Sequence, residues 1–175
     1  MIRPVLIAMT LMAMTLIAMA LLAAAPALAQ EPVGCDKFKW PLDHERALLA
    51  SPAQKPSGAD LPQPLATAVT VALVPYAEAK LPVTPSRAPK AANNNAGFIQ
   101  VSAVPKPGTY RVTLSAPAWI DVIQNGHTLQ STAFSGASGC AGIAKSVKFE
   151  LAAAPFTVEV SSTTAHALTF VVTPD

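Results

Sequence analysis

The stretch from residue 108 to residue 136, GTYRVTLSAPAWIDVIQNGHTLQSTAFSG, constrains the fold more than any other part of the chain. Between positions 110 and 114 apolar and polar residues alternate, which is the two-residue period of a strand buried on one face. Pro117 ends that run, and a second apolar run follows. Asn125 and Gly126 then separate two extended segments, and this pair predicts a β-hairpin because both central residues of a type I′ turn need a positive φ. We therefore expect three consecutive strands here.

Other segments of the chain show the same alternation and are separated by turns rich in glycine, proline and asparagine. They are residues 65–74, 97–104, 143–151, 155–161 and 167–173. About eight short strands at close spacing are typical of a sandwich. The sequence thus predicts an all-β fold, an antiparallel β-sandwich of the jelly-roll or Greek-key type, over residues 65–175.

Residues 1–29 have the pattern of a signal peptide. Arg3 precedes a long uncharged apolar run, and Ala27, Leu28 and Ala29 form an A-x-A cleavage site before Gln30. The run is also long enough to span a bilayer, so an uncleaved anchor is the alternative. The small residues before Gln30 favour cleavage. We expect a periplasmic or secreted protein that meets a membrane only through this segment before cleavage.

The chain has two cysteines, Cys35 and Cys140. In an exported protein such a pair predicts a single disulfide. Because the closed loop would be long, the stabilisation would reach roughly 4 to 5 kcal/mol in the chain-entropy model and less in practice. A redox or metal-binding pair is the alternative. The chain has no C-x-x-C motif and no histidine near either cysteine, which favours the disulfide.

Residues 30–64 are expected to form an N-terminal arm with one helix over residues 35–50. Pro41 suits the first helical position, and Asp43 and Glu45 would lie in the first turn. The disulfide would hold this helix against the sandwich, with His44 and Glu45 on a solvated face. Two proline-rich stretches follow. Residues 51–64 are predicted to be a linker without paired strands, and residues 75–95 a mobile surface loop.

The charge balance argues against nucleic acid as a partner. Twelve Lys and Arg stand against ten Asp and Glu, and no window of the sequence holds a basic cluster. Nucleic-acid binding needs clustered positive charge that displaces counterions from phosphates. We therefore expect no nucleic-acid partner, and the partner is open between an envelope protein and a carbohydrate.

No catalytic motif is visible, and no cofactor or metal is expected. His44, His127 and His166 are isolated, without H-x-H or H-x-x-x-H spacing. Glu150 and Glu159 fall on the outward positions of their predicted strands, where exposed charges are expected, which argues against a carboxylate pair for glycoside hydrolysis. The sequence therefore predicts no catalytic residues.

Asp121 is the polar residue that the strand pattern explains least, because it shares a strand face with a tryptophan. A small patch for carbohydrate or peptide would comprise Tyr110, Trp119, Asp121, Asn125 and His127. In the alternative interpretation Trp119 packs in the core, and Asp121 pairs with a lysine of a neighbouring strand, Lys145 or Lys148.

The order G-x-Y-x-V-x-L from Gly108, then WIDVIQNGHTL, then KSVKFELAAAPFTVEVSS resembles the bacterial pre-peptidase C-terminal type of domain. The resemblance covers residues 97–173 and departs where that family has an aspartate-rich D-x-D-L segment. It implies a non-catalytic accessory sandwich in an exported protein, without a calcium site to carry over. The whole chain is also similar to small exported proteins of proteobacteria. Some of these carry a homogentisate dioxygenase label, but the His/Glu iron-site pattern of that enzyme is absent here.

Two functions remain open from the sequence. The first is a non-catalytic periplasmic sandwich that acts as a binding or envelope-accessory protein. The second is a small metal-dependent, dioxygenase-like jelly-roll enzyme that uses His127 or His166 with carboxylates. A carbohydrate contact at Trp119 is a third role, compatible with the first.

Overall fold

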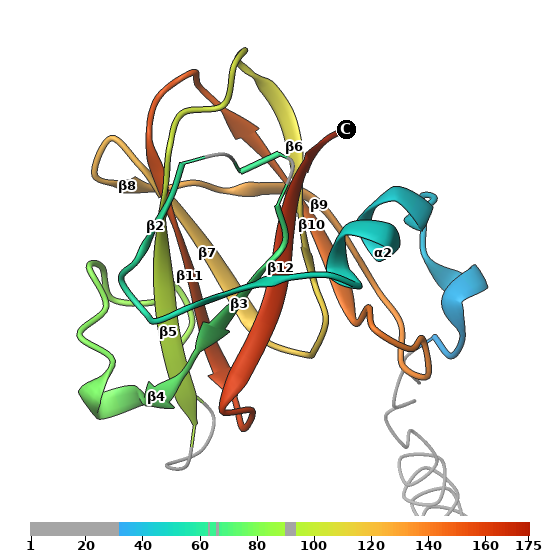
Figure 1. Ribbon diagram of the computed structural model, residues 1–175, viewed down its shortest axis with the longest axis horizontal. Coiled ribbons are helices and arrows are strands. Elements are labelled where there is room, and N and C mark those ends of the chain that lie inside the picture. The colour runs from blue at the N-terminus through green and yellow to red at the C-terminus, as the bar shows by residue number, and fades with distance from the viewer. Residues whose placement is uncertain (1–31, 63, 66, 90–93) are drawn as a thin grey trace, which may run out of the picture. The chain divides into compact units, whose positions relative to one another are not determined.

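A computed structural model describes residues 32–62, 64, 65, 67–89 and 94–175. The predicted signal peptide, residues 1–29, lies outside the described residues. Two mixed sheets make up the fold (Figure 1). The first has the strand order β1 (Ala53–Lys55), β3 (Val69–Ala72), β12 (Ala167–Pro174), β6 (Gly108–Leu114), β10 (Lys145–Leu151) and β9 (Ser131–Gly136). The second has the order β2 (Asp60–Leu61), β5 (Asn95–Val101), β11 (Phe156–Thr163), β7 (Trp119–Gln124) and β8 (His127–Thr128), and β4 (Val74–Pro75) also pairs with β5.

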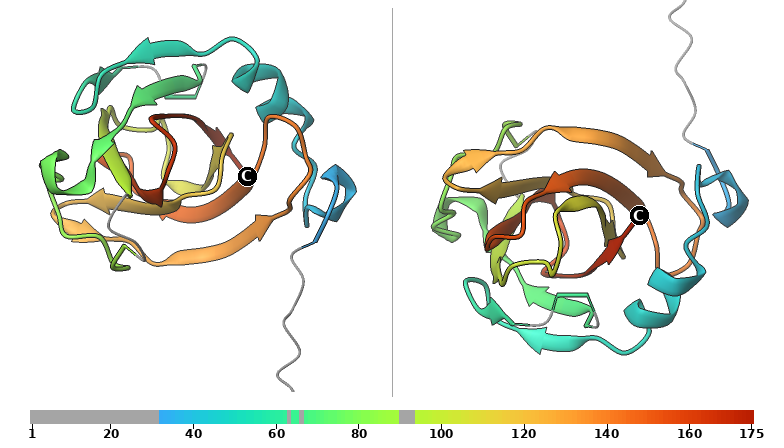
Figure 2. Two further views of the ribbon diagram at one scale, coloured as in Figure 1. Left: turned by 90° about the horizontal axis from the view of Figure 1, so that it is seen from below. Right: turned by 90° about the horizontal axis from the view of Figure 1, so that it is seen from above.

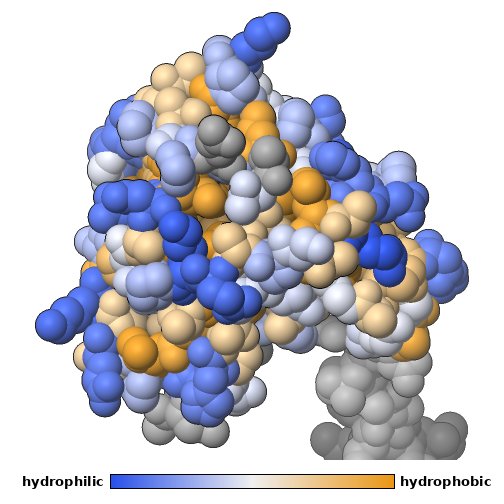
Figure 3. Space-filling model, in the orientation of Figure 1, coloured by the Kyte–Doolittle hydropathy of each residue, from blue (hydrophilic) through white to orange (hydrophobic). Residues whose placement is uncertain are grey.

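The predicted β-sandwich is confirmed, and the inward positions of its strands are those that the alternation indicated. Val112 and Leu114 of β6, Val158 of β11 and Phe170 of β12 are all buried in one apolar core between the sheets. On the face drawn in Figure 3, apolar side chains form scattered patches between polar ones. The apolar core between the sheets is the main source of stability, because folding removes its side chains from water.

The stretch of residues 108–136 crosses the sandwich twice. β6 belongs to the first sheet, β7 and β8 form a hairpin in the second, and β9 returns to the first. The hairpin turn is confirmed, because φ is 54° at Asn125 and 77° at Gly126. Only two residues separate β8 from β9, and only one separates β3 from β4, so the chain links the two sheets at both sides. Figure 2 shows the sheets curving around the core.

The predicted disulfide between Cys35 and Cys140 is present. It joins the N-terminal arm to the loop after β9, where Leu42, Ile143 and Cys140 form a second small apolar cluster. Trp40 adds a hydrogen bond from its Nε1 to Ser146 Oγ at 3.2 Å. The arm thus covers the outer face of the first sheet, which explains why polar residues of that face are buried.

The predicted helix over residues 35–50 is only partly present. A 3₁₀ turn, η1 (Cys35–Lys37), precedes a short helix, α2 (Asp43–Leu49). Leu42 is the N-cap, so Pro41 lies before the helix and not at its first position. The expected solvated face is wrong for Glu45, which is 1% exposed. Its carboxylate accepts a hydrogen bond from Thr173 Oγ1 at 2.6 Å and lies 3.3 Å from the Arg111 guanidinium.

The prediction that residues 51–64 are unpaired is also wrong. β1 pairs with β3, and β2 pairs with β5, both in parallel. The paired residues of β1 lie between Pro52 and Pro56, so the prolines bound the strand and remove none of its hydrogen-bond donors. Edge strands tolerate prolines at such positions. Within the described residues, none of the helices has the length and hydropathy needed to cross a membrane.

Candidate functional site

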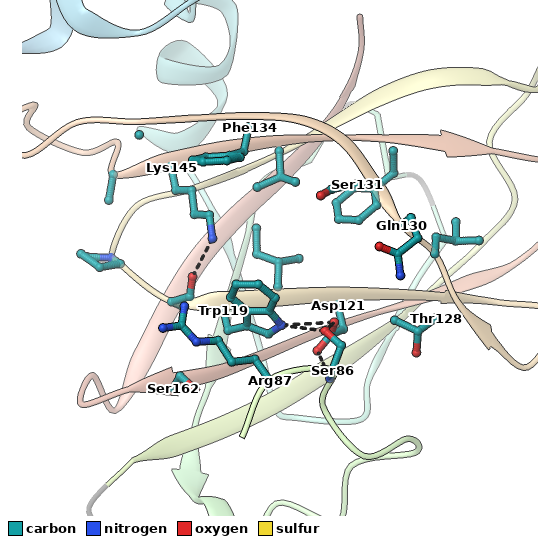
Figure 4. Close-up of a pocket in the computed structure, with 18 of the residues that line it drawn as sticks. Ser86, Arg87, Trp119, Asp121, Thr128, Gln130, Ser131, Phe134, Lys145 and Ser162 are labelled. Atoms are coloured by element: carbon teal, nitrogen blue, oxygen red, sulfur yellow. Dashed lines mark hydrogen bonds between the residues drawn. The ribbon is translucent and has the colours of Figure 1, made fainter. Parts of the chain in front are cut away.

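A cleft of about 730 Å³ opens between β7 of the second sheet and β9 and β10 of the first. Its lining comes mainly from the loop before β5, the β7–β9 stretch and β10 with the loop before it, and is completed by Pro32 and Ser162. The lining includes the side chains of Ser86, Arg87, Trp119, Asp121, Phe134 and Lys145 (Figure 4). A volume in this range is typical of small-molecule sites.

Asp121 forms a hydrogen-bonded cluster with Ser86 and Trp119 at the bottom of the cleft. Its Oδ2 accepts a bond from the Ser86 backbone N–H at 3.1 Å, and its Oδ1 accepts from the Ser86 hydroxyl. Trp119 Nε1 donates to Asp121 Oδ1 at 3.2 Å and to Ser86 Oγ at 3.0 Å. The expected pairing of Asp121 with Lys145 or Lys148 is therefore wrong. Both carboxylate oxygens are used to fix the tryptophan and the loop.

Trp119 lies at the cleft and not in the core, because it sits on the outward face of β7 and is half-buried. Two cations contact its ring. Lys145 Nζ lies 5.0 Å from the ring centroid, and Arg87 Cζ lies 5.1 Å from it. Both distances are within the range of cation–π attraction. The ring is therefore already in contact with two charged groups before any ligand arrives.

Glu159 lies next to Asp121, because the two residues are direct cross-strand partners in β11 and β7. It is 1% exposed, so its predicted exposure is wrong, whereas Glu150 is exposed as expected. Glu159 Oε1 accepts a hydrogen bond from the Val83 N–H at 3.0 Å, and Oε2 has no partner among the described residues. Burial, together with a smaller effect of the Asp121 charge, raises the pKa of Glu159 to about 7, although the hydrogen bond from the Val83 N–H opposes the rise.

The loop between η2 (Tyr76–Glu78) and β5 brings this cluster together. Its backbone donates N–H groups from Val83 to Glu159 and from Ser86 to Asp121. The part of it that the structure describes is therefore anchored to the outer face of the second sheet, in contrast to the mobile loop expected from its prolines. The two carboxylates thus accept hydrogen bonds from loop N–H groups that pair with no strand.

The predicted patch is only partly brought together. Trp119 and Asp121 share the cleft, as described above. Tyr110 lies in the core on β6 and donates its hydroxyl to Lys106 O at 2.8 Å. Asn125 and His127 are exposed at the β7–β8 turn and do not line the cleft.

His127 and His166 lie near opposite ends of the second sheet. His127 faces Gln124, whose partner on β11 is Phe156. His166 lies beside Asn95, whose partner on β11 is Thr163. The two ends of that strand are about 23 Å apart at 3.3 Å per residue, so these histidines do not share one metal ion. In the chain that the structure describes, no cluster of three His, Cys, Asp or Glu residues is suited to a metal.

Sequence analysis did not identify Ser86, Arg87 or Phe134 as candidate site residues, and it did not place Lys145 at a cleft. Asp121 and Glu159 each stood on an outward strand position, and a long uncovered loop with backbone donors was available to cover them. Outward carboxylates together with a loop that offers N–H donors could have indicated the site. The sequence does not show, however, that β7 pairs with β11 and brings the two carboxylates side by side.

Comparisons with family models, curated proteins and solved structures found no match to this chain.

Proposed function

We propose that this chain is an exported, non-catalytic β-sandwich that binds a small ligand in the cleft at Trp119. The observation that carries the proposal is the cleft itself: about 730 Å³, with an aromatic ring, two cations and an exposed phenylalanine around one space. Ligand sites in proteins are mostly apolar with a few placed polar groups, and this arrangement has that composition.

The side chains at the cleft are suited to binding and positioning. Asp121 uses both oxygens in hydrogen bonds to Ser86 and Trp119. Glu159 lies under the loop, away from solvent. Among the described residues, neither His127 nor His166 belongs to a group of three His, Cys, Asp or Glu side chains that could hold a metal, which disfavours the metal-dependent enzyme built on either histidine. Metal analysis of the purified protein tests that alternative; iron or zinc in stoichiometric amount, lost in His127→Ala or His166→Ala, would support it.

Export is supported by the predicted signal segment and by the disulfide, because structural disulfides persist in oxidising compartments. Cell fractionation with N-terminal sequencing tests it. A mature protein that begins near Gln30 in the periplasmic or secreted fraction is expected. A cytoplasmic protein that begins at Met1 would contradict this part of the proposal.

The chain has only two tryptophans, so replacing Trp40 leaves Trp119 as the single indole fluorophore for a binding assay. In Trp40→Phe, Trp119 is the remaining fluorophore, and energy transfer to the uncharged probe N-phenyl-1-naphthylamine is expected on titration. In the matched variant Trp119→Phe, the affinity for the probe, read from the probe's own emission, should be weaker, because Trp119 lines the cleft and Trp40 does not. Saturable binding that is insensitive to Trp119→Phe and to Phe134→Ala, or no binding at all, would refute a ligand site in this cleft.

A further inference from the structure

We infer that the ligand of the cleft is a small organic anion, with a carboxylate or similar acidic head held by Lys145 and Arg87 and an apolar body against Trp119 and Phe134. This inference rests on the proposed function and specifies the ligand class for the same site. It is carried by two neighbouring cations that lack an acidic partner among the described residues.

Lys145 is a half-buried cation whose hydrogen bonding is incomplete. Its Nζ donates to Ala118 O at 3.4 Å, and within the described residues it has no carboxylate within 4.0 Å. An ammonium carries three donors, so this long bond leaves donors to be satisfied from the cleft. Burial, followed by the nearby Arg87 charge, lowers the pKa of Lys145, and the Asp121 charge opposes that change.

Lys148, three residues further along β10, is a lysine with both an aromatic contact and an acidic partner. Its Nζ also lies over an indole, 4.5 Å from the Trp40 ring centroid, and it forms an ion pair of 2.6 Å with Asp175. In the part of the chain that the structure describes, Lys145 has the aromatic contact without an ion pair. An anionic ligand would supply the missing group.

Arg87 adds the second cation at the same place. Its guanidinium lies over Trp119, and no hydrogen bond or ion pair to a residue that the structure describes engages it. Asp121 does not fill this role, since Ser86 and Trp119 occupy both of its oxygens. A guanidinium binds a carboxylate through two parallel hydrogen bonds, and an ammonium beside it can add a third.

The apolar half of the site comes from β9. Phe134 is 60% exposed, which is unusual for an aromatic side chain on a strand of this sandwich, and it lines the cleft with Lys145 (Figure 4). An exposed ring beside two cations that have no acidic partner among the described residues suits the apolar body and the charged head of an amphipathic anion. A cationic ligand would be repelled by Lys145 and Arg87, and a neutral sugar would bring no negative charge to these two cations.

Two probes with the same aromatic frame test the inference. 8-Anilinonaphthalene-1-sulfonate carries a sulfonate, and N-phenyl-1-naphthylamine does not. In wild type, both are expected to bind. Lys145→Met and Arg87→Gln should each weaken the sulfonate probe by about tenfold or more, as loss of a charge-assisted hydrogen bond implies, and change the neutral probe by less than about twofold. Lys145→Arg should retain sulfonate binding.

Lys106→Met is the matched control, since Lys106 is exposed and does not line the cleft; it should change neither probe. Near-ultraviolet circular dichroism of every variant excludes binding to a loosened core. If both probes bind and the cation variants leave sulfonate affinity unchanged, or weaken both probes alike, the anion inference is wrong and cleft binding stands. If neither probe binds, the proposed function fails as well.

Discussion

Replacement of Glu159 by glutamine is expected to stabilise the protein at alkaline pH and to have little effect at acidic pH. Glu159 is 1% exposed, lies across from Asp121 and has one carboxylate oxygen without a partner among the described residues. Its ionised form is therefore poorly solvated in the folded protein. Glutamine has nearly the shape of the neutral acid, and its Oε1 can still accept the Val83 N–H.

The pKa of Glu159 sets both the sign and the size of the effect. It rises from an ordinary 4.5 to about 7 on folding. Below pH 4.5 the carboxyl is protonated in both states, so it adds no pH dependence. Between the two values the unfolded chain loses the proton and the folded chain keeps it, so the free energy of unfolding falls as pH rises. At about 1.4 kcal/mol for each pKa unit, the full loss is about 3 kcal/mol above pH 7.

Urea unfolding of wild type and Glu159→Gln at pH 4, 5.5, 7 and 8.5, at fixed ionic strength and with the disulfide intact, measures this loss. The other titratable groups contribute equally to both proteins, so their contributions drop out of the difference in unfolding free energy. It should become more favourable to the variant by about 2 to 3 kcal/mol between pH 4 and pH 8.5. Glu150→Gln is the control, because Glu150 is an exposed carboxylate on β10, a strand of the other sheet; its effect should stay within about 0.5 kcal/mol.

A difference that stays constant across this pH range would refute the reasoning. It would mean that Glu159 ionises in the folded protein without a cost. A difference that moves in favour of wild type would mean that a favourable partner for the carboxylate exists, and the description of its environment would be wrong.

Three further changes follow from the fold. The double variant Cys35→Ser/Cys140→Ser should lose about 2 to 4 kcal/mol of unfolding free energy in urea without reductant, because the closed loop spans 105 positions; a loss below about 1 kcal/mol would contradict a stabilising crosslink. Glu45→Ala should cost about 3 kcal/mol in the same assay, because it removes a buried carboxylate from Arg111; an effect typical of an exposed helix position would refute its burial. Gly126→Ala should lower stability by about 1 kcal/mol, since φ is 77° there; unchanged stability would argue against the type I′ turn.

Inward strand positions could be predicted from the sequence because they depend on local periodicity. The alternation around Val112, Val158 and Phe170 indicated which face of each strand is apolar, and the structure buries those side chains. The Asn125–Gly126 turn was predictable for the same reason, since its backbone conformation is set by the two residues themselves. The disulfide followed from there being only two cysteines in a chain whose sequence predicts an export signal.

Outward positions were decided only by the tertiary structure. Glu45, Asp121 and Glu159 stand where the local pattern predicts exposure or a simple strand pair, and each is buried by a segment distant in sequence. Periodicity indicates which residues of a strand lie on the same face, but it does not indicate which distant segment covers that face.

A sandwich of alternating strands, its hairpin and its disulfide could all be inferred from the amino-acid sequence, because they depend on residues near one another or on a single possible pairing. Only the tertiary structure placed β6 and β7 in different sheets and paired β7 with β11. It also brought a proline-rich loop over that pair. The cleft with Arg87, Trp119 and Lys145 exists because of these long-range contacts, whose register no local period encodes.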